Sequence, residues 1–377
     1  MAKINILHVV LSLETGGLER IVTEIVSGID KSVFNSSVCC LDRLGEFADI
    51  VKRNGINVSL LKRNQKRYDY FFPFKLRKML LMKDIHILHL HSGTFFLGAQ
   101  AGILARTPIM VYTDHGRLLG ETKIQLITDK ISGFLVDKIV AVSKELGKYL
   151  KNIVGLQTQK IIVIENGINT GVFTDREKPE HLMREFNIPN NCKVIGTVGR
   201  LAEVKDQLTL IEAFKIVNDK IPNTMLIIVG DGPMYNQLDD AVKKTGLSHN
   251  VRLLGNIKDV DQLINIFDVF LLTSLSEGTS VSLLEAMSAG IAPIVTDVGG
   301  NLSIIEDQTN GLLVKPRQPR QIADNILKLL LDDNYRSVLS HEAQNTVRNK
   351  YSIHMMNRKY TELYTDLIKE KRLNLLD

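Results

Sequence analysis

The chain has 377 residues, enough for about two domains of ordinary size. Hydrophobic residues make up 44% and charged residues 24%, a balance that excludes disordered and fibrous proteins, and no apolar stretch reaches the ~18 residues of a membrane-spanning helix. The net charge of +5 comes from the first half, because residues 1–165 carry 23 Lys and Arg against 15 Asp and Glu, and residues 166–377 carry 24 against 27. We therefore expect an anionic surface or substrate to face the amino-terminal half.

Short β-branched runs alternate with amphipathic stretches along the chain, the pattern of parallel sheets flanked by helices. The strands expected in the first half are residues 4–11, 36–41, 58–61, 85–90, 109–113, 138–142 and 161–164. Helices are expected between them, for example at residues 18–27 and 95–104.

The pattern restarts in the second half and predicts a second doubly wound unit. Its expected strands are residues 193–198, 225–229, 251–254, 269–272, 291–296 and 311–314, before long helical segments. Residues 166–189 carry an Asn-Gly pair, two prolines and several charges, which favours a linker. The predicted domains are residues 1–167 and 168–350, followed by a terminal helix in 351–377. Open α/β sheets bind ligands at the carboxyl ends of their strands, so two facing domains would form a cleft there.

Two strand ends of the first half carry candidate residues. Gly16 and Gly17 lie between a strand and a helix, where a backbone without side chains could approach a ligand or simply turn. His115 follows another strand and is the candidate for contact with a sugar hydroxyl or developing charge. We interpret His89 and His91 as ordinary satisfied polar residues.

The segment 62–83 is rich in basic and aromatic residues. Its cations are Lys62, Arg63, Lys66, Arg67, Lys75, Arg77, Lys78 and Lys83, interleaved with Tyr68, Tyr70, Phe71, Phe72 and Phe74. This composition suits an anionic membrane interface, and it suits a solvated loop with an ordinary helix equally well. We expect no nucleic-acid binding because no recognised motif accompanies the cations.

Two patterns that suggest metals or disulfides are discounted. The cysteines Cys39, Cys40 and Cys192 lack metal-ligand spacing, and the absence of a secretory signal favours free thiols in a reducing cytoplasm. Asp259 and Asp261 resemble a short metal-binding acidic motif, but their position before an amphipathic stretch favours a helix amino-terminus.

The second half opens with two strands that each end in a candidate loop. Gly199 and Arg200, with Lys205, follow the first strand, and both cations could neutralise a leaving diphosphate or be ordinary surface charges. Gly230 and Gly232 follow the next strand, but a dinucleotide fingerprint is disfavoured because Tyr235 stands at its third glycine position. That loop could approach a nucleobase or phosphate, or be a plain turn.

The most informative stretch is residues 274–290, which follow a buried strand and begin a helix. Backbone N–H groups of Thr279, Ser280 and Val281 would form an anion site at the helix start. Glu285, one turn in, could accept hydrogen bonds from ribose hydroxyls, and Glu277 in the loop could bind sugar hydroxyls. The alternative is an exposed loop acid and a solvated helical residue.

Together these motifs resemble the retaining glycosyltransferases of family four, which have the GT-B fold of two Rossmann-like domains. The matching residues, in the family's order, are Gly16-Gly17, Asp114-His115-Gly116, Asn166-Gly167-Ile168, Gly199-Arg200 with Lys205, Gly230-Asp231-Gly232-Pro233, Glu277 with Glu285, Gly299-Gly300 and Gly311-Leu312-Leu313-Val314. The resemblance covers nearly the whole chain.

The resemblance implies a donor site in the carboxy-terminal domain and an acceptor site in the amino-terminal domain. In it, Arg200 and Lys205 bind the donor diphosphate, Glu285 the ribose, and Glu277 with Gly278 and the following loop the sugar. His115 contacts the sugar near its reacting carbon, and Gly17 lies near the diphosphate. No metal or other cofactor is implied. The family often has an aromatic residue where this chain has Thr279, so donor preference does not carry over.

The chain looks most like members that assemble bacterial exopolysaccharide or cell-surface glycans. A UDP-sugar is the favoured donor and a GDP-sugar the other candidate, and the implied acceptor is a glycan, often linked to polyprenyl diphosphate. Such an acceptor would place the protein at the inner face of the cell membrane. A nucleotide-sugar epimerase and an inactive donor-binding partner subunit remain as alternatives.

Overall fold

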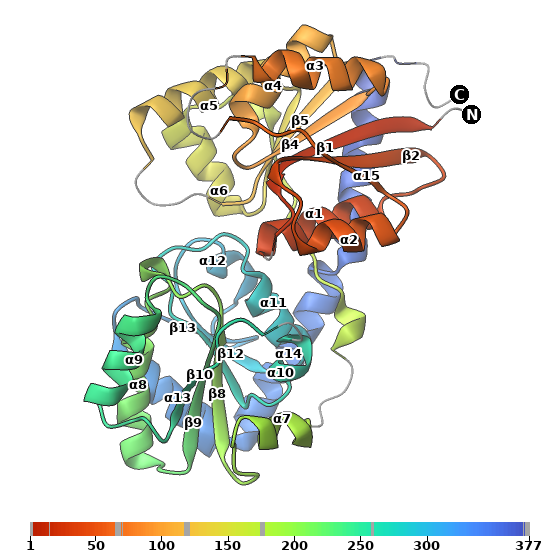
Figure 1. The fold of residues 1–377 in the computed structure, drawn as a ribbon. Coiled ribbons are helices and arrows are strands. Elements are labelled where there is room, and N and C mark those ends of the chain that lie inside the picture. The colour runs from red at the N-terminus through yellow and green to blue at the C-terminus, as the bar shows by residue number, and fades with distance from the viewer. Residues whose placement is uncertain are drawn as a thin grey trace. The chain divides into compact units, whose positions relative to one another are not determined.

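The chain forms two units that each contain a parallel sheet between layers of helices (Figure 1). The computed structural model describes residues 3–14, 16–64, 69, 71–116, 121–173, 178–257, 260–371 and 373. The amino-terminal unit comprises Met1–Gly167 and Ile353–Asp377, and the carboxy-terminal unit comprises Ile168–Ser352. Among the described residues, no helix is both long and apolar enough to span a bilayer.

The amino-terminal unit has a seven-stranded sheet in the order β3-β2-β1-β4-β5-β6-β7, and every pair is parallel. Its strands are β1 (Ile4–Ser12), β2 (Phe34–Arg43), β3 (Asn57–Leu60), β4 (Ile87–His91), β5 (Ile109–Asp114), β6 (Lys138–Ala141) and β7 (Ile161–Val163). Its helices are α1 (Gly17–Gly28), α2 (Glu46–Arg53), α3 (Phe72–Met82), α4 (Phe95–Ala105), α5 (Lys123–Leu135), α6 (Lys144–Tyr149) and α15 (Ile353–Glu370), with a π-turn at Leu150–Val154 and a 3-10 turn at Thr158–Lys160.

The two faces of this sheet have separate apolar cores. Leu7 and Val9 of β1 pack with side chains of α3 and α4, whereas Val10 packs with side chains of α1 and α2. Neighbouring residues point to opposite faces because side chains alternate along a strand. Cys39 and Cys40 of β2 divide between the same two cores as buried free thiols, which confirms the prediction for this pair.

The carboxy-terminal unit has a six-stranded parallel sheet in the order β10-β9-β8-β11-β12-β13. Its strands are β8 (Lys193–Val198), β9 (Thr224–Val229), β10 (Val251–Leu253), β11 (Val269–Leu272), β12 (Ala292–Thr296) and β13 (Leu312–Val314). Its helices are α7 (Glu180–Glu185), α8 (Gln207–Lys220), α9 (Tyr235–Lys244), α10 (Val260–Ile264), α11 (Val281–Ser288), α12 (Asn301–Ile304), α13 (Pro319–Leu331) and α14 (Asp333–Lys350), with 3-10 turns at Thr170–Val172 and Glu203–Lys205.

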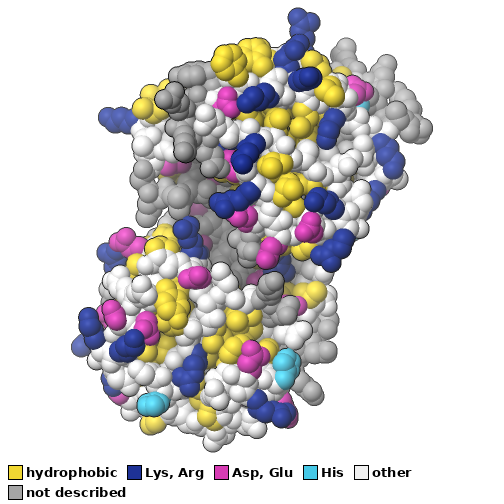
Figure 2. Space-filling model, in the orientation of Figure 1, with side chains coloured by type: hydrophobic (Ala, Val, Ile, Leu, Met, Phe, Trp, Pro, Cys, Tyr) yellow, Lys and Arg dark blue, Asp and Glu magenta, His cyan; other side chains and the backbone are white. Residues whose placement is uncertain are grey.

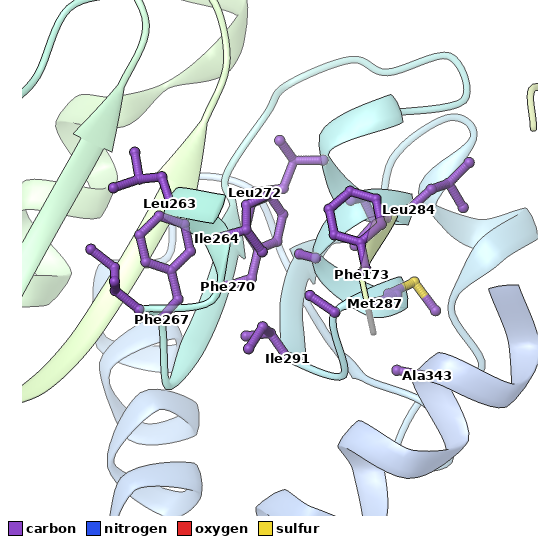
Figure 3. Close-up of a cluster of buried hydrophobic side chains, with 14 of the residues drawn as sticks. Phe173, Leu263, Ile264, Phe267, Phe270, Leu272, Leu284, Met287, Ile291 and Ala343 are labelled. Atoms are coloured by element: carbon purple, nitrogen blue, oxygen red, sulfur yellow. The ribbon is translucent and has the colours of Figure 1, made fainter. Parts of the chain in front are cut away.

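Figure 3 shows part of the apolar core of this unit, where Phe270 and Leu272 of β11 lie near Leu284 and Met287 of α11. Phe173, which belongs to the segment 166–189, is only 2% exposed and packs in the same core. The predicted linker 166–189 does contain the boundary between the two units, at Gly167 and Ile168, but its described residues after the boundary pack on the carboxy-terminal unit. Pro179 precedes α7 and Pro189 begins a turn, and buried apolar side chains hold the segment in the core.

Each sheet has one place where the chain changes the direction in which it adds strands. In the amino-terminal unit this lies between β1 and β4, and in the carboxy-terminal unit between β8 and β11. The loops that follow the two strands diverge at such a point and leave room for a ligand. The candidate residues Arg200 and Glu277 follow β8 and β11.

Candidate functional site

An ion pair joins the two loops that leave β8 and β11. Lys205 Nζ contacts Glu277 Oε1, and the Glu277 side chain is only 9% exposed. Ser274 Oγ donates a 2.6 Å hydrogen bond to the same carboxylate oxygen. The interpretation of Glu277 as an exposed loop acid is therefore wrong. The carboxylate is held by a cation and a hydroxyl, which fixes its direction.

Backbone contacts hold the same two loops together. The Thr273 hydroxyl lies 3.0 Å from the Lys205 carbonyl and 3.1 Å from that of Asp206, and it donates to both. The N–H of Leu275 donates to the Val204 carbonyl at 2.7 Å. These bonds order the polypeptide on both sides of the ion pair.

Helix α11 begins at Val281, as predicted, directly after the Glu277 loop. The hydroxyl of Ser280 accepts from the N–H of Leu283 at 3.4 Å and caps the helix. Thr279 and Ser280 are both buried, and Glu285, one turn into the helix, is only 4% exposed. The interpretation of Glu285 as a solvated residue is therefore wrong. Burying a carboxylate is costly without partners, and Glu285 has an interaction partner within the protein.

Glycines allow four loops to pack in two pairs, backbone against backbone, near this ion pair. A Cβ on Gly300 would lie 2.0 Å from the carbonyl oxygen of Gly278, and one on Gly299 would lie 2.0 Å from that of Glu277. Gly230 has φ +130°, and a Cβ there would lie 2.0 Å from the Gly199 carbonyl oxygen. Close packing therefore explains the glycine pairs without a ligand.

The two remaining candidate residues of this unit are Gly232 and Arg200. A Cβ on Gly232 would lie 2.3 Å from the Leu201 carbonyl oxygen, so this loop also lies against the one after β8. The Arg200 side chain is exposed and forms no ion pair with a described residue. The Arg200 carbonyl accepts from Gln207 Nε2 at 3.1 Å, which anchors the backbone while the guanidinium faces solvent.

In the amino-terminal unit, the candidates lie after β1 and β5. Gly16 is the amino-terminal cap of α1, and Gly17 is the first helical residue. The backbone N–H of His115 donates to Ser92 Oγ at 2.9 Å, in the loop after β4. His115 Nδ1 is buried and has no hydrogen-bond partner among the described residues.

A row of imidazoles that the sequence did not reveal joins the half-buried His115 to the buried His91, His89 and His8. His115 Nε2 lies 2.9 Å from His91 Nδ1, and His91 Nε2 lies 3.2 Å from His8 Nδ1. His8 and His89 are register partners on β1 and β4, and His91 follows two residues on, so all three side chains point to one face of the sheet. Burial lowers the pKa of His8 and His115 to about 3. Burial, followed by the neighbouring imidazoles, holds the pKa of His89 and His91 well below the ordinary value.

The group His8, His89 and His91 has ligand atoms within 4.8 Å of one another, and we tested it as a metal site. His89 Nδ1 lies 2.6 Å from the Tyr364 hydroxyl of α15, and its Nε2 lies 2.7 Å from Thr113 Oγ1, so both nitrogens have partners. The rings of His89 and His91 stack with centroids 4.3 Å apart. Both nitrogens of His91 are also paired, so the arrangement fits a hydrogen-bonded stack better than a converging ligand set.

The acidic pair has only one member within the described residues. Asp261 lies in the first turn of α10, as expected of an acidic residue at a helix start, and Asp259 lies outside the described part. Asp261 does not belong to the one group of potential metal ligands found among the described residues.

The sequence predicted most of these positions, but it did not predict which candidate residues contact each other. Lys205 and Glu277 were assigned to different parts of a donor, and the structure pairs them with each other. Ser274, which orients Glu277, was quoted in the motif but given no role. The periodicity of β1 and β4 could have placed the histidines on one face.

Profiles of two glycosyltransferase families match consecutive parts of the chain. "Glycosyltransferase Family 4" matches residues 15–172, and "Glycosyl transferases group 1" matches residues 178–346. The chain is 30% identical over 279 residues to an uncharacterized glycosyltransferase of Methanocaldococcus jannaschii, which covers 71% of each chain. The chain belongs to this glycosyltransferase family. The resemblance seen in the sequence is thereby confirmed, and the protein is a glycosyltransferase.

Other similar proteins act in bacterial glycan assembly. One is the UDP-Gal:alpha-D-GlcNAc-diphosphoundecaprenol alpha-1,3-galactosyltransferase of Escherichia coli, 28% identical over 98% of this chain and 99% of that one. Another is the capsular polysaccharide biosynthesis glycosyltransferase CapM of Staphylococcus aureus, 26% identical over 77% of this chain and 81% of that one. A structure of Anabaena HepE in complex with UDP matches 97% of this glycosyltransferase and all of that chain, with TM-score 0.85 and 20% identity. It confirms the fold of two Rossmann-like domains.

Proposed function

We propose that this glycosyltransferase moves a hexose from a UDP-sugar, or alternatively a GDP-sugar, to a lipid-linked glycan with retention of configuration. The observation that carries the proposal is the ordered polar cluster of Lys205, Glu277 and Ser274 at the point where β8 and β11 diverge. The UDP in the HepE structure and the diphosphoundecaprenol acceptor of the E. coli relative support the substrate classes.

In this proposal, the carboxy-terminal unit holds the donor. Arg200 and Lys205 bind the diphosphate, because an exposed guanidinium and a half-buried ammonium can each donate charge-assisted hydrogen bonds to phosphate oxygens. The start of α11, with Thr279, Ser280 and Val281, presents backbone N–H groups to the same anion. Glu285 binds the ribose, and Glu277 with Gly278 binds the sugar. Gly199, Gly230 and Gly232 form the part of the site that lies against the nucleotide.

For the amino-terminal unit, we propose that His115 contacts the donor sugar and that Gly16 and Gly17 lie near the diphosphate. His115 Nδ1 is the polar atom that remains for a ligand, because Nε2 is held by His91. The half-buried imidazole, whose pKa desolvation lowers to about 3, is neutral at physiological pH, so it would act by hydrogen bonding rather than as a cation.

The proposed reaction needs no divalent metal and no protein nucleophile. The diphosphate leaves as its charge is stabilised by Arg200, Lys205 and the helix start. The acceptor hydroxyl attacks the same face of the sugar, and its proton passes to the leaving phosphate oxygen. The glycosidic bond to the diphosphate breaks while the bond to the acceptor forms, so atoms and charge balance.

The first experiment is calorimetric titration of the purified protein with UDP, GDP and ADP in EDTA, followed by donor turnover. Arg200→Ala and Glu285→Ala should each weaken catalysis by about 2–4 kcal/mol while the fold is kept. Lys215→Ala is the matched control, because Lys215 is an exposed cation of α8 paired with Asp219. Unchanged turnover in both site variants would overturn the site assignment.

The same measurements separate the alternative functions. Conversion of the donor sugar to an epimer without any acceptor would identify an epimerase. Binding of nucleotide without turnover on any lipid-linked acceptor would favour an inactive partner subunit.

A further inference from the structure

Helix α5 of the amino-terminal unit carries its apolar side chains on the solvent side. Ile124, Ile127, Ile131 and Phe134 are exposed by 74%, 59%, 49% and 55%. Their spacing of three, four and three residues places them along one stripe of the helix. The side that packs on the protein contains Ser132 and Gly133, both buried, and Leu126 and Leu135 pack against the core. The helix therefore has a second apolar stripe in solvent in addition to its packed side, whereas an ordinary surface helix is polar there.

The neighbouring helices of the same layer extend this apolar surface. Helix α4 packs against both α3 and α5. Its carboxy-terminal end exposes Ile103 and Leu104, and Arg77 of α3 donates a 3.0 Å hydrogen bond to the Leu104 carbonyl. The exposed apolar side chains of α3 and the residue before it are Phe71, Phe74, Leu81 and Met82. Large exposed apolar patches mark interaction sites on soluble proteins.

Positive charges border the apolar side chains of all three helices. Lys123 and Lys130 of α5 flank one edge of the isoleucine stripe, and both are exposed. Lys75 and Lys78 are exposed on α3, and Arg106 follows α4. Figure 2 shows yellow and dark-blue side chains together over the region where Figure 1 labels α3 and α4. Aliphatic and aromatic side chains with a cationic border are the composition of interfacial helices.

We propose that the outward face of α3, α4 and α5 docks on an anionic lipid bilayer, with the α5 stripe inserted at the headgroup boundary. The charge of the border selects this occupant, because cations flank the apolar stripe and meet lipid phosphates there. The segment 62–83 alone was the earlier candidate, and the structure adds α5, which carries a second exposed apolar stripe. The proposal agrees with a lipid-linked acceptor but does not depend on it.

The test is sedimentation of the full chain with vesicles of phosphatidylcholine, with and without phosphatidylglycerol. The double variant Ile127→Ser/Ile131→Ser should lower the partition coefficient on the anionic vesicles by about tenfold or more. Lys123→Gln/Lys130→Gln should lower binding on anionic vesicles only, and added salt should have the same effect. The matched control is Leu331→Ser/Val338→Ser, which removes two exposed apolar side chains of the other unit, 74% and 61% exposed.

Each outcome decides the proposal. Wild-type binding to anionic vesicles that falls in the α5 variants and not in the control supports it. No binding to either vesicle, or equal loss in the control, overturns it. A concentration-dependent dimer that the α5 variants disperse would instead assign the face to a second copy of the chain. Calorimetric UDP binding measured on the same variants tests the proposed donor site separately, since all four α5 residues lie outside the carboxy-terminal unit.

Discussion

Stability of the amino-terminal unit should fall steeply with acid because of its buried histidines. His8 is fully buried and has a pKa of about 3, against an ordinary value of 6.5. The His8 imidazole therefore takes up a proton near pH 6.5 in the unfolded chain but only near pH 3 in the folded chain. Stability from this residue is complete above pH 6.5 and is lost as the pH falls toward 3.

The magnitude follows from the difference between these pKa values. At pH 5, His8 alone should cost about 2 kcal/mol relative to pH 7.5, since each pH unit below 6.5 costs about 1.4 kcal/mol. The pKa values of His89, His91 and His115 are lowered as well, so the four together approach about 5.5 kcal/mol per pH unit well below 6.5. A loss of this size is a large fraction of ordinary domain stability.

The assay is urea denaturation at several pH values, with hydrogen–deuterium exchange of peptides from β1 and β4 to report on this unit. His8→Val should reduce the slope of unfolding free energy against pH by about one proton, whatever it costs at pH 7.5. His249→Gln, an exposed histidine of the other unit, is the control. A wild-type slope below one proton between pH 6 and 5, or an equal slope in His8→Val, would refute the reasoning.

Three further predictions concern single contacts. Glu277→Gln removes the charge paired with Lys205 and should lower kcat/KM for the donor by roughly a hundredfold with the fold intact, measured by initial rates; unchanged rates would contradict it. Gly230→Ala should destabilise by more than about 2 kcal/mol in urea because its Cβ would overlap a backbone carbonyl, whereas Gly246→Ala, with φ +74° and no atom within 4 Å, should cost about 1 kcal/mol; equal losses would argue against the overlap. Tyr364→Phe leaves a buried nitrogen of His89 without its hydrogen bond and should lower the free energy of unfolding by about 1–3 kcal/mol. Thermal and urea unfolding measure this loss, and unchanged unfolding would contradict the prediction.

The sequence predicted the sheets well because a buried parallel strand is a short apolar run between turn residues. All thirteen strands lie within two residues of the expected ranges. The segment 166–189 was predicted to be a linker from its local composition alone. Its Asn166-Gly167 pair lies in no turn, and the burial of Phe173 depends on an apolar surface built by β11 and α11, which lie about a hundred residues further along the chain.

The candidate site was predicted as a set of residues and not as an arrangement. Glu277 and Lys205 were each found by motif, yet their contact depends on the order of β8 and β11 in the sheet. Strand order is a tertiary property that local sequence patterns do not specify. The exposed stripe of α5 was missed because periodicity finds an apolar face without telling which way it points.

The histidine row also limits what His115 can do, because a neutral imidazole carries one proton on two nitrogens. Two hydrogen bonds link His115, His91 and His8, so they must run in one direction. When His91 donates to His115, the free His115 Nδ1 carries a proton, and His8 Nε2 is a bare acceptor. When the direction reverses, His115 Nδ1 becomes the acceptor, and His8 Nε2 carries the proton. Both end atoms are buried without a partner among the described residues. A group that binds at His115 Nδ1 therefore determines which nitrogen of the neutral His8 ring carries its proton, two hydrogen bonds away.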